Sequence, residues 1–251
     1  MNIDWSALRS ELAQWRRDRL ALPFWWRDDD AIEPTAALEK LGALSCETGV
    51  TVHLAVIPKL ASDLLAGQMG TAFIPVMHGW THRNTAPDGA KNAEFGIGRD
   101  PGEVKKELTA GIARMQDIFG DAFSRMFVPP WNRLDTDVLP ILKSAGFSAV
   151  STYAPRKDKA PVPGLEMINT HIDPIFWRGT RGLVPPETLV SQIVTLLRDR
   201  RLGLADNAEP LGYLTHHLVH DDDIWEFSRQ FMTEMCEGPL TLFRHDRKDT
   251  A

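Results

Sequence analysis

The chain has 251 residues, of which 43% are hydrophobic and 25% are charged, a balance typical of a globular protein with room for one large α/β domain. The net charge of −6 argues against nucleic acid or an anionic membrane as a partner, because both favour a basic patch. No apolar run is long enough to span a bilayer, and residues 1–20 lack the basic start and apolar core of a secretory signal, so we expect a cytoplasmic protein.

Segments with helical periodicity alternate with short apolar stretches along the whole chain. Helices are expected at 4–20, 34–47, 61–68, 103–119, 136–145, 186–201 and 224–235. Strands are expected at 23–26, 51–57, 71–77, 126–128, 147–151, 165–168 and 211–215. The alternation predicts an α/β fold with a parallel sheet or barrel, forming a single domain over 1–251 with its barrel at 22–240.

Three adjacent carboxylates, Asp28, Asp29 and Asp30, follow the first expected strand. Carboxylates this close repel one another, so the run either caps the following helix or is neutralised by a cation. In a parallel barrel the carboxyl ends of the strands meet on one face, where active sites lie. The run is therefore a candidate site in which one carboxylate binds a cation and its neighbour acts as a base.

Two histidines four residues apart, His78 and His82, follow the strand expected at 71–77. Their imidazoles point the same way if the segment turns helically. Two neutral imidazoles and one carboxylate make a zinc-type ligand set with open positions for water and substrate. Because both groups follow expected strands, we expect a divalent metal between the histidines and the acidic run.

Two further loops carry residues suited to the wall of a pocket. One is a rigid Pro-Pro-Trp segment, which either packs against the barrel or presents a backbone N–H to an oxyanion. The other is an Asp-containing segment that ends in Trp, where the carboxylate either orients a histidine or lies on the surface. The candidate substrate-binding residues are Pro130, Trp131, Arg133, Asp173 and Trp177.

The adjacent histidines His216 and His217 follow the last expected strand. A histidine at the end of a buried strand is costly unless it is hydrogen-bonded or functional. Strand alternation places Leu214 and His216 on one face and Thr215 and His217 on the other. One of the two histidines is a candidate general acid, because imidazole titrates near neutral pH.

Taken in order, these motifs resemble those of the polysaccharide deacetylase family, the NodB-type carbohydrate esterases. The family pattern runs Asp-Asp-Gly, His-Ser/Thr-x-x-His, Arg-x-Pro-aromatic, Asp-x-x-Asp-Trp and Leu-x-His. The similar segments here are Asp29–Ala31, His78–His82, Val128–Trp131, Asp173–Trp177 and Leu214–His216. The resemblance covers most of the chain and implies a distorted (β/α) barrel of about seven strands, the NodB-like fold.

The resemblance also implies roles for individual residues. If Ala31 occupies the position of the motif glycine, Asp29 is the base and Asp30 is a metal ligand with His78 and His82. The other register would use Asp28 and Asp29 instead. His216 is the implied acid, with His217 as the alternate, and the Trp131 backbone N–H is expected to stabilise the oxyanion.

Besides Ala31 at the position of the motif glycine, three positions depart from the family pattern. Gly79 replaces the hydroxyl residue after the first histidine, and Phe176 replaces the second aspartate of its motif. Val128 stands where the family has an arginine that braces the catalytic aspartate, so we expect Arg27 or Arg133 to substitute for it.

The resemblance implies a metal-dependent hydrolase that removes an acetyl or other acyl group from an N- or O-acylated carbohydrate or glycoconjugate. The implied cofactor is a divalent metal, zinc in the first place, with cobalt, manganese or nickel as alternatives. Two other functions stay open: a metal-dependent amidohydrolase acting on a small non-sugar amide, and a non-catalytic barrel that binds a glycan or another ligand. The missing arginine and the lost aspartate motivate the second of these.

Overall fold

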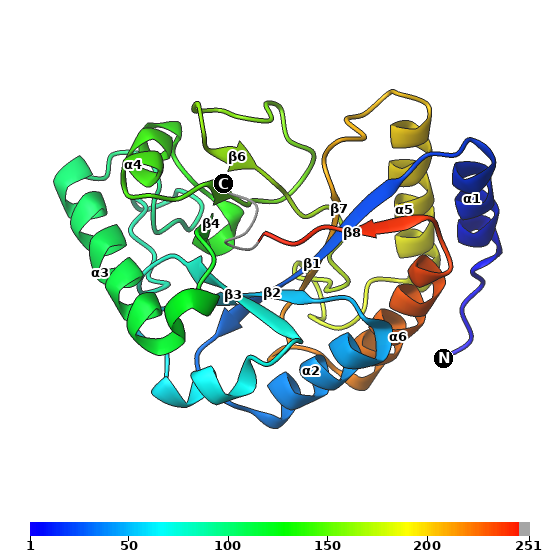
Figure 1. Cartoon of the computed structure of the whole chain (residues 1–251), viewed down its shortest axis with the longest axis horizontal. Coiled ribbons are helices and arrows are strands. Elements are labelled where there is room, and N and C mark those ends of the chain that lie inside the picture. The colour runs from blue at the N-terminus through cyan, green and yellow to red at the C-terminus, as the bar shows by residue number, and fades with distance from the viewer. Residues whose placement is uncertain (246–251) are drawn as a thin grey trace.

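The computed structural model describes residues 1–245, in which a curled sheet of parallel strands is surrounded by helices (Figure 1). The strands are β1 Leu22–Ala31, β2 Val52–Val56, β3 Phe73–His78, β4 Met126–Val128, β5 Ala149–Val150, β6 Glu166–Met167, β7 Leu211–Thr215 and β8 Leu240–Leu242. The helices are α1 Ser6–Arg17, α2 Ala36–Thr48, α3 Pro101–Phe119, α4 Leu139–Ser144, α5 Pro186–Arg201 and α6 Asp222–Cys236. Short 3-10 helices cover Asp63–Gln68 (η1), Gly120–Ala122 (η2), Pro130–Asn132 (η3) and Thr136–Val138 (η4).

The strand order is β6-β5-β4-β3-β2-β1-β7, and every neighbouring pair is parallel. This arrangement confirms the predicted distorted (β/α) barrel of NodB type. The eighth strand, β8, pairs with the first residues of β1 and was not predicted, because a three-residue Leu-Thr-Leu segment is too short to carry a periodic signal.

The two faces of the sheet bury different sets of apolar side chains. In β1, Phe24 and Trp26 join the large core between the sheet and the helices, whereas Trp25 joins a smaller core inside the curl of the sheet. The smaller core is made by side chains such as Ala55 of β2 and Val76 of β3. Because strand residues alternate between faces, this pattern fixes which polar side chains at the strand ends point into the barrel.

Local sequence signals set the helix boundaries. The Thr35 hydroxyl caps α2 by accepting from the Leu38 N–H at 3.0 Å, and Gly49 ends that helix with a left-handed φ of 71°. Asp100 caps α3, whose first residue is Pro101, a position where the missing N–H is not needed. The helix expected at 136–145 is divided into η4 and α4, because Pro140 is tolerated only in the first turn of an α-helix.

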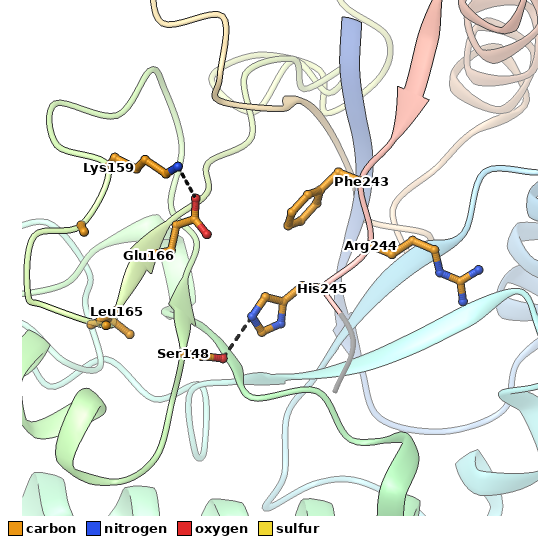
Figure 2. Close-up of a pocket in the computed structure, with 9 residues that line it drawn as sticks. Ser148, Lys159, Leu165, Glu166, Phe243, Arg244 and His245 are labelled. Atoms are coloured by element: carbon orange, nitrogen blue, oxygen red, sulfur yellow. Dashed lines mark hydrogen bonds and ion pairs between the residues drawn. The ribbon is translucent and has the colours of Figure 1, made fainter. Parts of the chain in front are cut away.

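The segment after β8 closes the end of the barrel opposite the carboxyl ends of the strands. The His245 ring contacts the Ser124 and Ser148 hydroxyls, and its backbone N–H donates to His53 at 2.9 Å. Phe243 and His245 point into a cavity of about 320 Å³ there, whereas Arg244 points away from it (Figure 2). None of the helices in residues 1–245 is both long and apolar enough to cross a membrane.

A buried ion pair joins β1 to the end of β7. Asp28 is on the helix side of β1, where its carboxylate accepts from the Thr215 hydroxyl, the His217 backbone N–H and the His217 ring. Burial alone would raise the pKa of Asp28, but the attraction and hydrogen bond of His217 outweigh it, so the pKa is lowered. Burial likewise opposes charge on His217, but Asp28 outweighs it and raises the pKa of the imidazole.

The pair predicts a characteristic pH dependence of stability. Asp28 contributes to the free energy of unfolding at pH values above its unfolded pKa of about 3.9. This contribution is lost as the pH falls through its folded pKa, which is lower. His217 contributes fully to the free energy of unfolding at pH values below its unfolded pKa of about 6.5. This contribution is lost as the pH rises through its folded pKa, which is higher. We expect His217→Gln to lower the free energy of unfolding by about 3 kcal/mol near pH 6, and by less at alkaline pH.

The measurement is urea denaturation between pH 5 and pH 9 of the wild type, His217→Gln, Asp28→Asn and the double variant. Their free energies of unfolding form a double-mutant cycle that gives the coupling energy of the pair. A coupling energy that is near zero and independent of pH would contradict the ion pair.

Candidate active site

The carboxyl ends of the strands surround a cavity of about 630 Å³. Its walls come from the last residues of β1 and β3 and from the segments that follow β3, β4, β5, β6 and β7, which is where parallel barrels place their reactive groups. Within residues 1–245, five of the seven non-glycine residues with positive φ line it: Asp30, His82, Trp131, Asn132 and Arg181. Strained backbone of this kind clusters at functional sites, because the surrounding structure must hold it in place.

The acidic run points in three directions. Asp29 continues the inward alternation of Trp25 and Arg27, while Asp28 faces the helices. Asp30 would face the helices' side by alternation, but its φ is 75° and the pairing of β1 with β2 shifts register between Asp28 and Ala31. This irregularity turns the Asp30 carboxylate to the mouth of the barrel.

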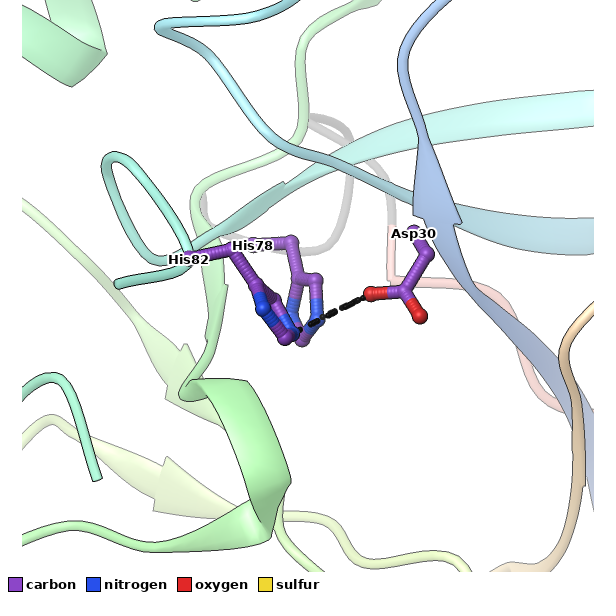
Figure 3. Close-up of side chains that lie close together, drawn as sticks. All are labelled: Asp30, His78 and His82. Atoms are coloured by element: carbon purple, nitrogen blue, oxygen red, sulfur yellow. Dashed lines mark hydrogen bonds and ion pairs between the residues drawn. The ribbon is translucent and has the colours of Figure 1, made fainter. Parts of the chain in front are cut away.

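Asp30, His78 and His82 converge at this mouth (Figure 3). One ligand atom from each lies within 4.8 Å of the others, and no other trio of such residues does so within residues 1–245. The Asp30 Oδ1 atom is 3.1 Å from His78 Nε2 and 3.3 Å from His82 Nε2. These are the three residues that the sequence pattern assigned to the metal.

The donor set fits a divalent cation. His78 Nδ1 lies 3.0 Å from the Val128 carbonyl, which can only accept, so Nδ1 carries a proton and Nε2 is the nitrogen that faces Asp30. An imidazole nitrogen and a carboxylate oxygen 3.1 Å apart repel unless a positive charge lies between them, and either a proton on Nε2 or a divalent cation supplies it. Two imidazoles and one carboxylate are a ligand set that zinc accepts with open positions.

The charges of the three groups are linked. Burial would raise the pKa of Asp30, but its hydrogen bond and attraction to His78 outweigh this and hold the pKa well below the ordinary value. Burial opposes charge on His78 too, yet Asp29 and Asp30 together raise the pKa of its imidazole. Burial and the neighbouring His78 lower the pKa of His82. The site therefore favours an ionised carboxylate and a neutral second imidazole, the forms that bind a metal.

Glu94 holds the loop that carries both histidines. It is buried, and its carboxylate accepts from the backbone N–H groups of Trp80 at 3.1 Å, Thr81 at 2.7 Å and His82 at 3.3 Å. A Cβ on Gly79 would lie 2.2 Å from Glu94 Oε2, and Gly79 has a φ of 57°. A residue with a hydroxyl side chain cannot occupy this position, because Glu94 fills the space and supplies the acceptors for the loop.

Asp29 is held by the guanidinium of Arg27, which is fully buried. Arg27 Nε lies 2.9 Å from Oδ1, and Nη2 donates to Oδ2 at 3.0 Å. The same guanidinium donates to Ser151 and to Asn132, each at 2.6 Å. Of the two arginines proposed to brace the aspartate, Arg27 makes the contact, whereas Arg133 donates to the Asn92 carbonyl.

His216 lines the same cavity, next to Asp29. Its Nε2 atom is 4.0 Å from Asp29 Oδ2, and its ring makes an edge contact with Trp177, with centroids 4.8 Å apart. Trp177 is fixed by its indole N–H, which donates to Asp173 at 2.7 Å. His217 is turned to Asp28 instead, so only His216 of the adjacent pair lines the cavity.

Trp131 forms the wall next to the metal ligands. Its ring lies against His82, with centroids 4.4 Å apart, and its positive φ of 57° follows the buried Pro130. Among residues 1–245, no carbonyl accepts the Trp131 backbone N–H. This donor is available to a ligand in the cavity.

Several residues of the site carry no signal in the sequence. Glu94 lies in a polar segment, 84–102, that predicts only a loop, and its burial is the first indication of a role. Asn132 and Ser151 contact Arg27 from different strand ends. Tyr153, Arg178 and Arg181 also line the cavity, and no spacing rule connects them to the metal ligands.

Similar folds occur among solved structures. A family 4 carbohydrate esterase from Streptomyces lividans in complex with acetate superposes with a TM-score of 0.54 at 13% identity, covering 88% of this chain and 91% of that chain. An acetyl xylan esterase from Clostridium thermocellum in complex with a cobalt ion gives 0.52 at 11% identity, covering 88% and 87%. A variant of the peptidoglycan deacetylase PdaC from Bacillus subtilis gives 0.55 at 12% identity, covering 90% and 88%.

No family model matches the sequence, and no curated protein matches it either. The chain thus has the fold of the polysaccharide deacetylases, in a divergent sequence that matches them by structure.

The role of Glu94 can be tested without any substrate. Replacing it by Gln puts an N–H donor opposite the loop N–H groups, so we expect Glu94→Gln to weaken zinc binding about 10- to 100-fold. Isothermal titration calorimetry on the metal-stripped protein measures the change. Glu103→Gln, an exposed residue of α3, is the matched control and should bind zinc normally. Unchanged affinity in a folded Glu94→Gln protein would rule out this role.

Proposed function

We propose that the protein is a metal-dependent deacetylase that removes an acetyl or related acyl group from an acylated carbohydrate. The observation that carries the proposal is the arrangement around one cavity. Asp30, His78 and His82 form a candidate metal site there, and Asp29 and His216 lie beside it. A base and an acid on either side of a metal site are the groups that acyl hydrolysis needs.

Asp29 is proposed as the base. The Arg27 guanidinium fixes the direction of its carboxylate, with Nε 2.9 Å from Oδ1 and Nη2 donating to Oδ2. A carboxylate that is oriented in this way and lines the cavity can take the proton of the water that attacks the acyl carbon. A divalent cation held by Asp30, His78 and His82 would supply Lewis acidity for the carbonyl and the water.

The remaining steps use residues on the cavity walls. The free Trp131 backbone N–H is proposed to donate to the oxyanion that forms when the acyl carbon is attacked. His216, held against Trp177, is proposed to protonate the leaving amine or alkoxide. Trp131 and Trp177 both line the cavity and offer flat apolar surfaces, which suit the faces of a sugar ring.

Two observations favour this function over a non-catalytic binding barrel. Arg27 compensates for the missing motif arginine, so the aspartate is braced even though the residue that braces it is different. The similar folds include one described as bound to acetate and one described as bound to cobalt. These descriptions belong to those proteins, and they support the proposal made for this chain.

The proposed roles of the acidic residues separate experimentally. Asp29→Asn keeps the shape of the side chain but removes the base, so we expect kcat on a generic acetyl ester to fall by about 10²- to 10⁴-fold while zinc still binds. Asp30→Asn should instead weaken zinc binding, because it removes a ligand. Normal turnover in Asp29→Asn together with lost turnover in folded Asp28→Asn would show that the other register is correct.

Metal dependence is tested on the purified protein. We expect elemental analysis to find about one equivalent of a divalent metal. Chelation should abolish ester hydrolysis, and zinc or cobalt should restore it. A protein without bound metal whose activity resists chelators would refute the metal-dependent mechanism. Comparing N-acetylated sugars with small non-sugar amides then decides between a carbohydrate deacetylase and the alternative amidohydrolase.

A further inference from the structure

Three arginines line the cavity beside the proposed catalytic groups: Arg133, Arg178 and Arg181. The protein as a whole carries a net charge of −6, so a group of cations in this one place is not a property of the surface in general. The three side chains come from two loops. Arg133 follows η3, and the other two lie between β6 and α5.

Arg133 is held in position with part of its guanidinium free. Its Nη1 atom donates to the Asn92 carbonyl at 2.7 Å, and the side chain is half-buried. It directly follows Asn132, which accepts from Arg27 at 2.6 Å. The position of Arg133 is therefore tied to the Arg27–Asp29 pair, and its remaining N–H groups are available to a ligand.

Arg181 is held over an aromatic ring that also lines the cavity. Its guanidinium carbon lies 5.3 Å from the centroid of the Trp177 ring, the ring that also contacts His216. Stacking on an aromatic face orients the guanidinium plane and leaves its edge free to donate. Arg178 lies next to Trp177 in the same loop and also lines the cavity.

The nearby carboxylates are occupied by other partners. Asp29 pairs with Arg27, and Asp30 faces the two histidines. Asp173 accepts from the Trp177 indole and from the Ile175 N–H. Asp221 caps α6 by accepting from the Ile224 N–H at 2.8 Å.

Within residues 1–245, none of the three arginines forms an ion pair. Arginines that line a cavity and have no protein carboxylate as their own partner are a usual way to recognise a ligand oxyanion.

We propose that the substrate carries an anionic group, a carboxylate or a phosphate, close to the acylated centre, and that Arg133 and Arg181 bind it from two different loops of the cavity wall with Arg178 adding charge. This inference rests on the proposed deacetylase function and specifies its substrate class. Neutral acetylated sugars fit the same cavity but leave the three arginines without an anionic partner, so they should be the poorer substrates.

The test compares three N-acetylated sugars that differ in charge: N-acetylglucosamine, its 1-phosphate, and N-acetylmuramic acid, which carries a carboxylate. The measured quantity is the ratio of kcat/KM for each anionic sugar to that for the neutral one, on the zinc-loaded enzyme. We expect a ratio of about ten or more for at least one anion, since a charge-assisted contact contributes about tenfold. The larger of the two ratios identifies phosphate or carboxylate as the preferred group.

Variants assign the preference to the arginines. Arg181→Gln and Arg133→Gln should each lower the ratio by about tenfold, and raising the ionic strength to 0.5 M should lower it in the wild type. Arg16→Gln removes the same charge from an exposed position of α1 and should leave the ratio unchanged. A ratio, unlike an absolute rate, is not altered by a partial loss of folded enzyme.

The outcomes distinguish the two levels of the proposal. A ratio near one in an enzyme that hydrolyses the neutral sugar overturns the anionic substrate and leaves the deacetylase function standing. A ratio that is high but equally high in Arg181→Gln and Arg133→Gln also overturns it, because the arginines are then not its cause. An enzyme that holds zinc yet hydrolyses no acetylated compound overturns the proposed function itself.

Discussion

The ion pair between Arg27 and Asp29 inside the barrel connects the fold to the site. A buried guanidinium is costly unless its hydrogen bonds are met, and Arg27 meets them through Asp29, Ser151, Asn132 and the Thr152 carbonyl. These partners come from β1 and from the residues that follow β4 and β5. The contacts that make the charge tolerable inside the barrel also orient Asp29 and position the loop that carries Trp131. Stability of the barrel and geometry of the site therefore rest on the same side chain.

The acidic run illustrates how one segment can serve three purposes. Adjacent carboxylates repel, and the structure separates them by direction: Asp28 pairs with His217 on the helix side, Asp29 with Arg27 inside the barrel, and Asp30 with the two histidines at the mouth. Strand alternation separates the first two. The third depends on the positive φ of Asp30, which interrupts the alternation. Each carboxylate thus has its own cationic or hydrogen-bonding partner, and the repulsion within the run is offset.

The departures from the family pattern are compensated from distant parts of the chain. The arginine missing near β4 is replaced by Arg27 of β1, and the missing hydroxyl at Gly79 is replaced by the carboxylate of Glu94. The aspartate that Phe176 replaces has no such substitute in its own segment, where Asp173 accepts a hydrogen bond from the Trp177 indole. Compensation of this kind keeps the geometry while changing the residues. It explains how a chain can superpose on solved esterases at 11 to 13% identity when no family model matches its sequence.

The sequence by itself determined the order of the helices and of all strands but β8, the parallel α/β architecture, and the residues that gather at the strand ends, while the resemblance to a family implied the barrel. Those depend on periodicity and on local caps, which neighbouring residues specify. The spacing also singled out His78 and His82, and the resemblance to the family pattern implied Asp30 once Ala31 was placed at the motif glycine. The choice between Arg27 and Arg133, the direction of Asp30, and the roles of Glu94 and the cavity arginines were decided by the tertiary structure. Each depends on contacts between residues far apart in the chain, or on a single irregular φ, and neither leaves a periodic signal in the sequence.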